Sequence, residues 1–216
     1  MFGDILEGWG ETIAINEGLQ GDGAAVLEPI EVESFEKQYI SEVDEVRINE
    51  TADIMKEFFS EDVLVNWSEL PLDERTEIIN EYYVKAGENL GIDTKGVIVE
   101  PMYSEPGKIA MGYNSGDGYI HLNEEVVGDP GMLGQVLDTA THEMRHQFQH
   151  DALANPDNFS DIPDNVMETW EYEWTPGNYI SPDYDYEGYY NQAIECDARD
   201  FSEDVLKSYM DKMHLN

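Results

Sequence analysis

The stretch of sequence that decides the fold is residues 131–150, which read GMLGQVLDTATHEMRHQFQH. At about 100° per residue, the apolar side chains of this stretch fall on one side of a helix. They are Leu133, Val136, Leu137, Ala140, Met144 and Phe148. His142 and His146 fall on the opposite side, together with Gln135 and Thr139. The pattern therefore predicts a helix that packs on the core with one face and turns its histidines towards a cleft.

Within this helix, residues 142–146 form the pattern His-Glu-x-x-His. Two positions four residues apart lie about 40° apart around the helix axis, so both imidazoles can reach one ion. The pattern is typical of zinc sites in which the glutamate, here Glu143, acts as a base on a water beside the ion. Three of the five histidines in the chain lie on this helix, which favours a zinc site over a chance arrangement.

A zinc ion that acts on a water needs a third protein ligand. His150 is a poor candidate, because eight residues separate it from His142 and place it about 12 Å further along a straight helix. His150 could line the cleft and stabilise developing charge, but we expect it to cap the helix C-terminus instead. Glu195 is the favoured ligand, since Ala198 one turn along is small enough to let two helices approach closely. Its rivals lie in a proline-rich segment where ligand geometry is harder to hold: Glu168, Glu171, Glu173 and Glu187.

Three segments carry a resemblance to known enzymes. They are GYIHLN at 118–123, LDTATHEMRHQFQ at 137–149, and the pattern Glu-x-x-Ala-x-x-Phe at 195–201. Together they resemble the gluzincin metallopeptidases, whose third zinc ligand is a glutamate on a later helix. The last pattern is similar to bacterial and phage peptidases of the ImmA/IrrE type and to peptidase domains of bacterial toxins.

The resemblance covers under a quarter of the chain, about 118–149 and 189–206. It implies a zincin-like fold in which Zn²⁺ is bound by His142, His146 and Glu195, with Glu143 as the general base. It also implies that the strand at 119–122 is a sheet edge that binds an extended protein or peptide substrate by strand addition.

Several further side chains are candidates for supporting roles. Tyr189 or Tyr190 could stabilise an oxyanion, although aromatic packing is the commoner role for any one tyrosine. Three aspartates could orient a ligand imidazole, namely Asp138, Asp197 and Asp200. Cys196 is expected to be a small buried side chain, and a lone cysteine excludes an intrachain disulfide framework.

The charge of the chain limits its partners. It has 48 acidic and 11 basic residues, and its formal net charge is −37. Phosphate recognition needs clustered Lys and Arg, so a nucleic-acid partner is excluded, as is docking on an anionic membrane. Between 109 and 198 the sole Lys or Arg is Arg145. Such a region favours cations, so we expect basic or polar substrates.

The remaining pattern predicts one α+β domain at 34–216, with a small mixed or antiparallel sheet, preceded by an acidic, weakly structured arm at 1–33. Helices are predicted over 35–60 as one or two pieces, over 71–90 and over 189–213. Strands are predicted at 97–99, 109–113 and 119–122, with a hairpin turn at 114–118. Residues 151–188, rich in Tyr and Asp, are expected to form a long irregular insertion.

The function that these features favour is hydrolysis of peptide bonds by a zinc-dependent enzyme. One alternative is a non-enzymatic acidic binding or inhibitor protein that mimics nucleic acid. Another is a toxin or effector peptidase exported to act in a different cell. The sequence has no recognisable cleaved signal peptide and no apolar run long enough to span a bilayer. We therefore expect a cytoplasmic protein, or one exported without a cleavable signal.

Overall fold

The computed structural model describes residues 42–103 and 109–215, so the predicted arm at 1–33 lies outside the described residues. The long helices are α2 (Glu42–Phe58), α4 (Leu72–Leu90), α6 (Leu133–Ala154), α7 (Asp164–Trp174) and α9 (Ala193–Met213). Shorter helices are α3 (Glu61–Asn66), α5 (Glu124–Gly128) and α8 (Tyr186–Tyr190), with 3-10 turns η1 (Trp67–Glu69), η2 (Pro130–Met132) and η3 (Pro156–Phe159). The strands are β1 (Gly96–Glu100), β2 (Gly112–Asn114) and β3 (Tyr119–Asn123). The predicted α+β class is confirmed.

The sheet is mixed, with β3 in the middle. β3 pairs in parallel with β1 and antiparallel with β2. The predicted hairpin turn joins β2 to β3 through Gly116 and Gly118, whose φ angles of 72° and 92° favour glycine. The expectation that the strand at 119–122 is a sheet edge is wrong, because a strand is paired with each of its two sides.

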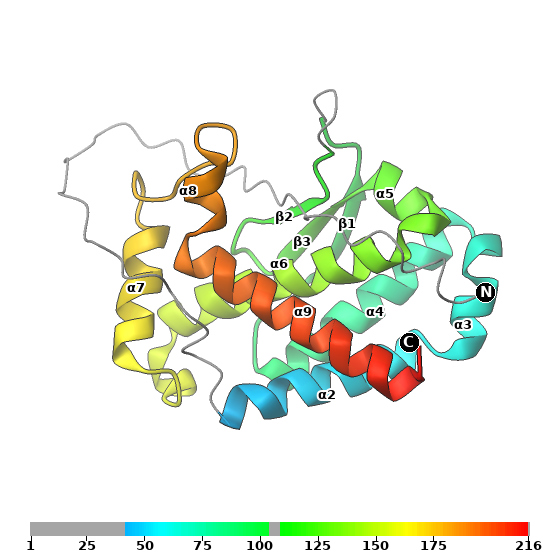
Figure 1. Ribbon diagram of the computed structural model, residues 1–216, viewed down its shortest axis with the longest axis horizontal. Coiled ribbons are helices and arrows are strands. Elements are labelled where there is room, and N and C mark those ends of the chain that lie inside the picture. The colour runs from blue at the N-terminus through cyan, green and yellow to red at the C-terminus, as the bar shows by residue number, and fades with distance from the viewer. Residues whose placement is uncertain (1–41, 104–108, 216) are drawn as a thin grey trace.

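Helix α6 lies at the centre of the molecule, between the sheet and the helices α7 and α9 (Figure 1). The predicted apolar face of α6 is buried. Most of the opposite face is buried as well, because Glu195 of α9 and Trp174 of α7 pack against its histidines. His142 and His146 are only 2% and 3% exposed. The expectation that this face opens onto a cleft is therefore wrong, and the histidines lie in an enclosed site.

The segment 151–188, expected to be irregular, is helical over 151–174 apart from short breaks and irregular over 175–185. α6 continues four residues past His150 to Ala154, and α7 follows after η3. Pro163 precedes α7 with an extended backbone, which suits a helix start because proline lacks the N–H that a helix interior needs. Val166 and Trp170, one turn apart, are buried against the core. Pro156 and Pro163 therefore stand at helix starts within it.

Arg145 joins three helices inside the protein. Its guanidinium donates to both carboxylate oxygens of Asp197 on α9, each at 2.8 Å. It also donates to Asp44 on α2 at 3.2 and 3.3 Å. The ring centroids of Phe148 and Phe201 lie 4.5 and 4.8 Å from the Cζ atom of Arg145. The two carboxylates raise the pKa of Arg145 although burial alone would lower it, so the guanidinium stays charged.

Replacing Arg145 with Met should lower the free energy of unfolding by about 3–5 kcal/mol, because the buried Asp44 and the part-buried Asp197 would lose the cation that they share. Urea denaturation of the metal-free protein measures this loss. Lys85→Met is the control, since Lys85 and Glu88 form an exposed pair whose loss costs less than about 1 kcal/mol. Similar losses in the two variants would contradict the bridging role of Arg145.

Candidate metal site

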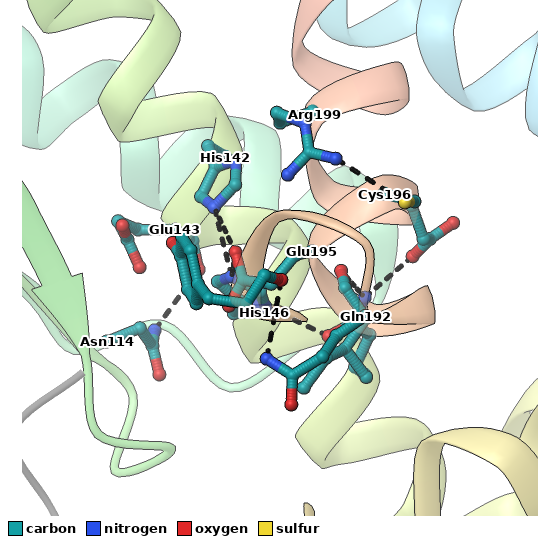
Figure 2. Close-up of polar contacts among 12 residues, drawn as sticks. Asn114, His142, Glu143, His146, Gln192, Glu195, Cys196 and Arg199 are labelled. Carbon is teal, nitrogen blue, oxygen red and sulfur yellow. Dashed lines mark hydrogen bonds and ion pairs between the residues drawn. The ribbon is translucent and has the colours of Figure 1, made fainter. Parts of the chain in front are cut away.

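Three buried side chains from two helices meet at one point. His142 and His146 lie on α6, and Glu195 lies in the first turn of α9. The Nε2 atoms of the two imidazoles are 3.0 Å apart, and Glu195 Oε2 is 3.4 Å from one and 3.5 Å from the other. Figure 2 shows the three side chains converging. The structure thus brings together the three predicted ligands in a group that could hold a metal ion.

The spacing of these atoms fits a small divalent ion. Ligand atoms about 2.0–2.2 Å from a tetrahedral ion lie about 3.3–3.5 Å from each other, close to the separations observed. Glu195 Oε2, the atom facing both imidazoles, is buried without a hydrogen-bond donor. A buried carboxylate oxygen needs a positive partner, which either an imidazolium or a metal cation supplies. Two imidazoles and one carboxylate form a donor set typical of zinc.

The charged groups of the site shift each other's pKa values. Burial alone would lower the pKa of His146, but the carboxylates of Glu195 and Glu143 raise it to about 9. Burial alone would raise the pKa of Glu195, but the two imidazoles hold that pKa well below its ordinary value. In the metal-free protein at neutral pH, the site therefore contains a carboxylate beside an imidazolium.

Glu143 lies next to this group and is 1% exposed. Burial raises its pKa, against the effect of the two imidazoles and of a hydrogen bond from the Asn114 backbone. The Oε1 atom of Glu143 is buried without a hydrogen-bond partner. The Asn114 side chain on β2 donates to the backbone carbonyl of Glu143 at 3.2 Å, a contact drawn in Figure 2. Glu143 is therefore a buried carboxylate with an unused acceptor beside the metal-binding group.

An aromatic cover encloses the site. Trp174, the last residue of α7, places its ring edge-on to His146 and also lies over His150 at 4.3 Å. Tyr179 stacks on Trp174 with their planes 1° apart. The Tyr179 hydroxyl donates to Glu195 Oε1 at 3.2 Å. We call Trp174 and Tyr179 the aromatic cover. Neither residue stands out in the sequence, because aromatic side chains are numerous throughout this segment.

The supporting roles predicted from the sequence have mixed outcomes. Tyr189 hydrogen-bonds Glu195, whereas Tyr190 lies away from the site under the guanidinium of Arg199. His150 does not cap α6, which continues to Ala154; its imidazole lies beside Trp174, and burial lowers its pKa to about 4. Cys196 is only half-buried and lies beside Arg199.

The other acidic candidates take different places. Asp197 reaches the imidazole of His146 only through Gln149, a residue that no sequence pattern had indicated. The roles of Asp138 and Asp200 stay predictions. Glu173 is not part of the metal-binding group, because its two oxygens accept from the backbone N–H groups of Ala193 and Ile194 at the start of α9. Arg145 was noticeable in the sequence as the sole Lys or Arg between 109 and 198. That observation did not predict its ion pairs with Asp44 and Asp197.

No protein-family model matches the chain, and no significant match was found among curated proteins or solved structures. None of the helices in the described residues is long and apolar enough to cross a membrane. The chemistry of the site is therefore the main indication of function.

Zinc should bind at about one ion per chain, and His142→Ala should abolish tight binding because it removes one of three ligands. Elemental analysis after dialysis measures the stoichiometry. His121→Ala is the matched control, since His121 stacks on Tyr113 and contacts Glu100 away from the site. Retention of zinc by the His142 variant would show that the ion binds elsewhere.

The apparent zinc affinity should rise about tenfold for each pH unit between 6.5 and 8.5, because zinc must displace the proton that His146 holds up to about pH 9. Chelator competition at several pH values measures the slope. Glu195 is the main cause of the raised pKa of His146, so in Glu195→Gln the affinity should be weaker and should level off at a lower pH. An affinity that does not change with pH would contradict this account.

Proposed function

We propose that this chain is a zinc-dependent metallopeptidase. The observation that carries the proposal is the position of Glu143, a buried carboxylate beside a group of two imidazoles and one carboxylate. A structural zinc site has no need of a fourth, unliganded acid in this place. The resemblance of the His-Glu-x-x-His and Glu-x-x-Ala-x-x-Phe patterns to gluzincins points to the same chemistry.

His142, His146 and Glu195 would hold the metal, and Glu143 would be the general base. Zinc bound there would polarise the scissile carbonyl and make a nearby water more acidic. Glu143 takes a proton from the attacking water and passes it to the leaving amine. In the metal-free protein burial raises the pKa of Glu143, so its carboxylate accepts a proton more readily than an exposed glutamate does.

Two tyrosines are suited to stabilise negative charge on the reacting carbonyl. Burial raises the pKa of Tyr179 and of Tyr189 well above the ordinary tyrosine value, so both hydroxyls keep their protons at neutral pH. Both lie within hydrogen-bond reach of Glu195. A hydroxyl that turned from Glu195 to the substrate would act as an oxyanion donor.

Because His142, His146 and Glu195 are almost wholly buried, a peptide would reach them only after side chains around the site, such as the aromatic cover, move. In the sheet, β3 is paired on both sides and cannot accept another strand, but β2 has no second strand partner among the described residues. In this proposal, the strand that binds an extended peptide by strand addition is therefore 112–114 and not 119–122. Asn114 in this strand already contacts Glu143. Arg145 is itself neutralised by two aspartates, so the site keeps its negative surroundings and favours basic or polar peptides.

Glu143→Gln should retain zinc and lower the rate of peptide cleavage by about 10²–10⁴-fold, because an amide cannot accept the proton. Mass spectrometry of a peptide mixture measures cleavage, and basic peptides should be cleaved first. Glu168→Gln, on the exposed side of α7, is the control and should cleave as the parent does.

If Glu143→Gln cleaves peptides as fast as the parent does, Glu143 is not the general base. A zinc-loaded parent that cleaves no peptide in the mixture would argue for the acidic binding protein instead. Cleavage by the parent, with the expected loss of rate in Glu143→Gln, would support the peptidase. The exported toxin or effector would then differ from it only in the cell where the enzyme acts.

A further inference from the structure

One side chain beside the site makes hydrogen bonds with both ends of its amide. Gln149, one turn beyond His146 on α6, has its Oε1 atom 2.9 Å from His146 Nδ1. Its Nε2 atom donates to the backbone carbonyl of Ile194 at 2.9 Å and to Asp197 Oδ2 at 2.8 Å. Gln149 is fully buried, so water does not compete for these bonds.

These contacts allow a single orientation of the amide. Ile194 O and the Asp197 carboxylate are both acceptors, so the group that faces them must be the NH₂. A flipped amide would place an oxygen against these two acceptors and leave the NH₂ facing His146. The Oε1 atom must therefore face the imidazole, which means that Nδ1 of His146 carries the hydrogen.

The proton on Nδ1 decides which nitrogen can bind a metal. With Nδ1 donating to Gln149, the lone pair of a neutral imidazole is on Nε2. That Nε2 atom is the one that faces His142 and Glu195. His142 has no such arrangement, because its Nδ1 is buried without a hydrogen-bond partner.

The amide is itself held in place from the far side. Asp197 Oδ2, which accepts from Gln149, also accepts from Arg145 Nε at 2.8 Å. Arg145 is in turn bound to Asp44. A continuous row of hydrogen bonds therefore runs from α2 through Arg145, Asp197 and Gln149 to the imidazole of His146.

We propose that Gln149 is a positioning residue that presents Nε2 of His146 to the metal, with Asp197 fixing the direction of its amide. The inference rests on the metal site of the proposed function and is independent of whether the protein cleaves peptides. It assigns a role to a glutamine outside the His-Glu-x-x-His pattern.

The test replaces Gln149 with Met, which has a similar length and cannot accept from Nδ1–H. Losing a partner of this kind weakens metal binding by about 10–100-fold, and chelator competition measures that change. Gln147→Met is the matched control. Gln147 is equally buried on the same helix and accepts from Asn114 and Gly118, but it does not contact either imidazole. The control should keep the zinc affinity of the parent.

A second measurement separates positioning from a general loss of stability. In the zinc-loaded parent labelled with ¹⁵N-histidine, the Nδ1–H signal of His146 should be protected from exchange with water. In Gln149→Met this signal should exchange quickly or disappear, whereas in Gln147→Met it should persist. Circular dichroism of the metal-free proteins confirms that both variants are folded.

The outcomes distinguish the two proposals. A parent that binds no zinc overturns the metal site of the proposed function. A parent that binds zinc, together with a Gln149 variant that binds it equally well and keeps a protected Nδ1–H signal, overturns the positioning role alone. Weaker binding in Gln149→Met with loss of the Nδ1–H signal, and neither change in Gln147→Met, supports it.

Discussion

Helices α6 and α9 meet through buried charged groups that neither helix can satisfy alone. Arg145 on α6 forms an ion pair with Asp197 on α9, and Glu195 on α9 lies beside two imidazoles of α6. An ionised group removed from water is tolerated only when an opposite charge or a set of hydrogen-bond donors replaces the water. Sliding one helix along the other would break both sets of contacts at once. This constraint fixes the relative position of the two helices, and with it the geometry of the candidate metal site.

The overall charge of the chain gives this arrangement a further consequence. A protein with a net charge of −37 attracts cations over its whole surface. The base in its middle region, Arg145, is buried between two aspartates and so does little to offset the field near the site. The same field that would draw a metal ion inward would also favour a positively charged peptide, so in the proposed function metal binding and the preference for basic peptides would share one electrostatic cause.

The aromatic cover is attached to the same helix that contributes the carboxylate. Glu173 accepts hydrogen bonds from the first N–H groups of α9, which places the end of α7 and its Trp174 beside the site. Gln192 binds both the N–H and the carbonyl of Ile180, which holds the loop that carries Tyr179. A loop held by a few hydrogen bonds opens at a lower free energy than the core. Access to the site and the position of Glu195 are thereby linked through the start of α9.

The sequence by itself was sufficient for features that depend on local spacing. The four-residue interval between His142 and His146, the apolar stripe of α6, and the glycines of the β2–β3 turn each act within a few residues, so their geometry follows from helix and turn rules. Glu195 was also found, because the small Ala198 one turn along marks a helix that can approach another closely.

Tertiary structure decided what depends on residues distant in the chain. Whether β3 is an edge or a central strand is set by which strands pair with it, and no local pattern records that pairing. The closure of the site by Trp174 and Tyr179, and the contact of Gln149 with Asp197, join residues that share no periodicity. Helix spacing therefore identified the groups that meet at the site, whereas long-range packing determined which side chains enclose it, orient it and hold it in place.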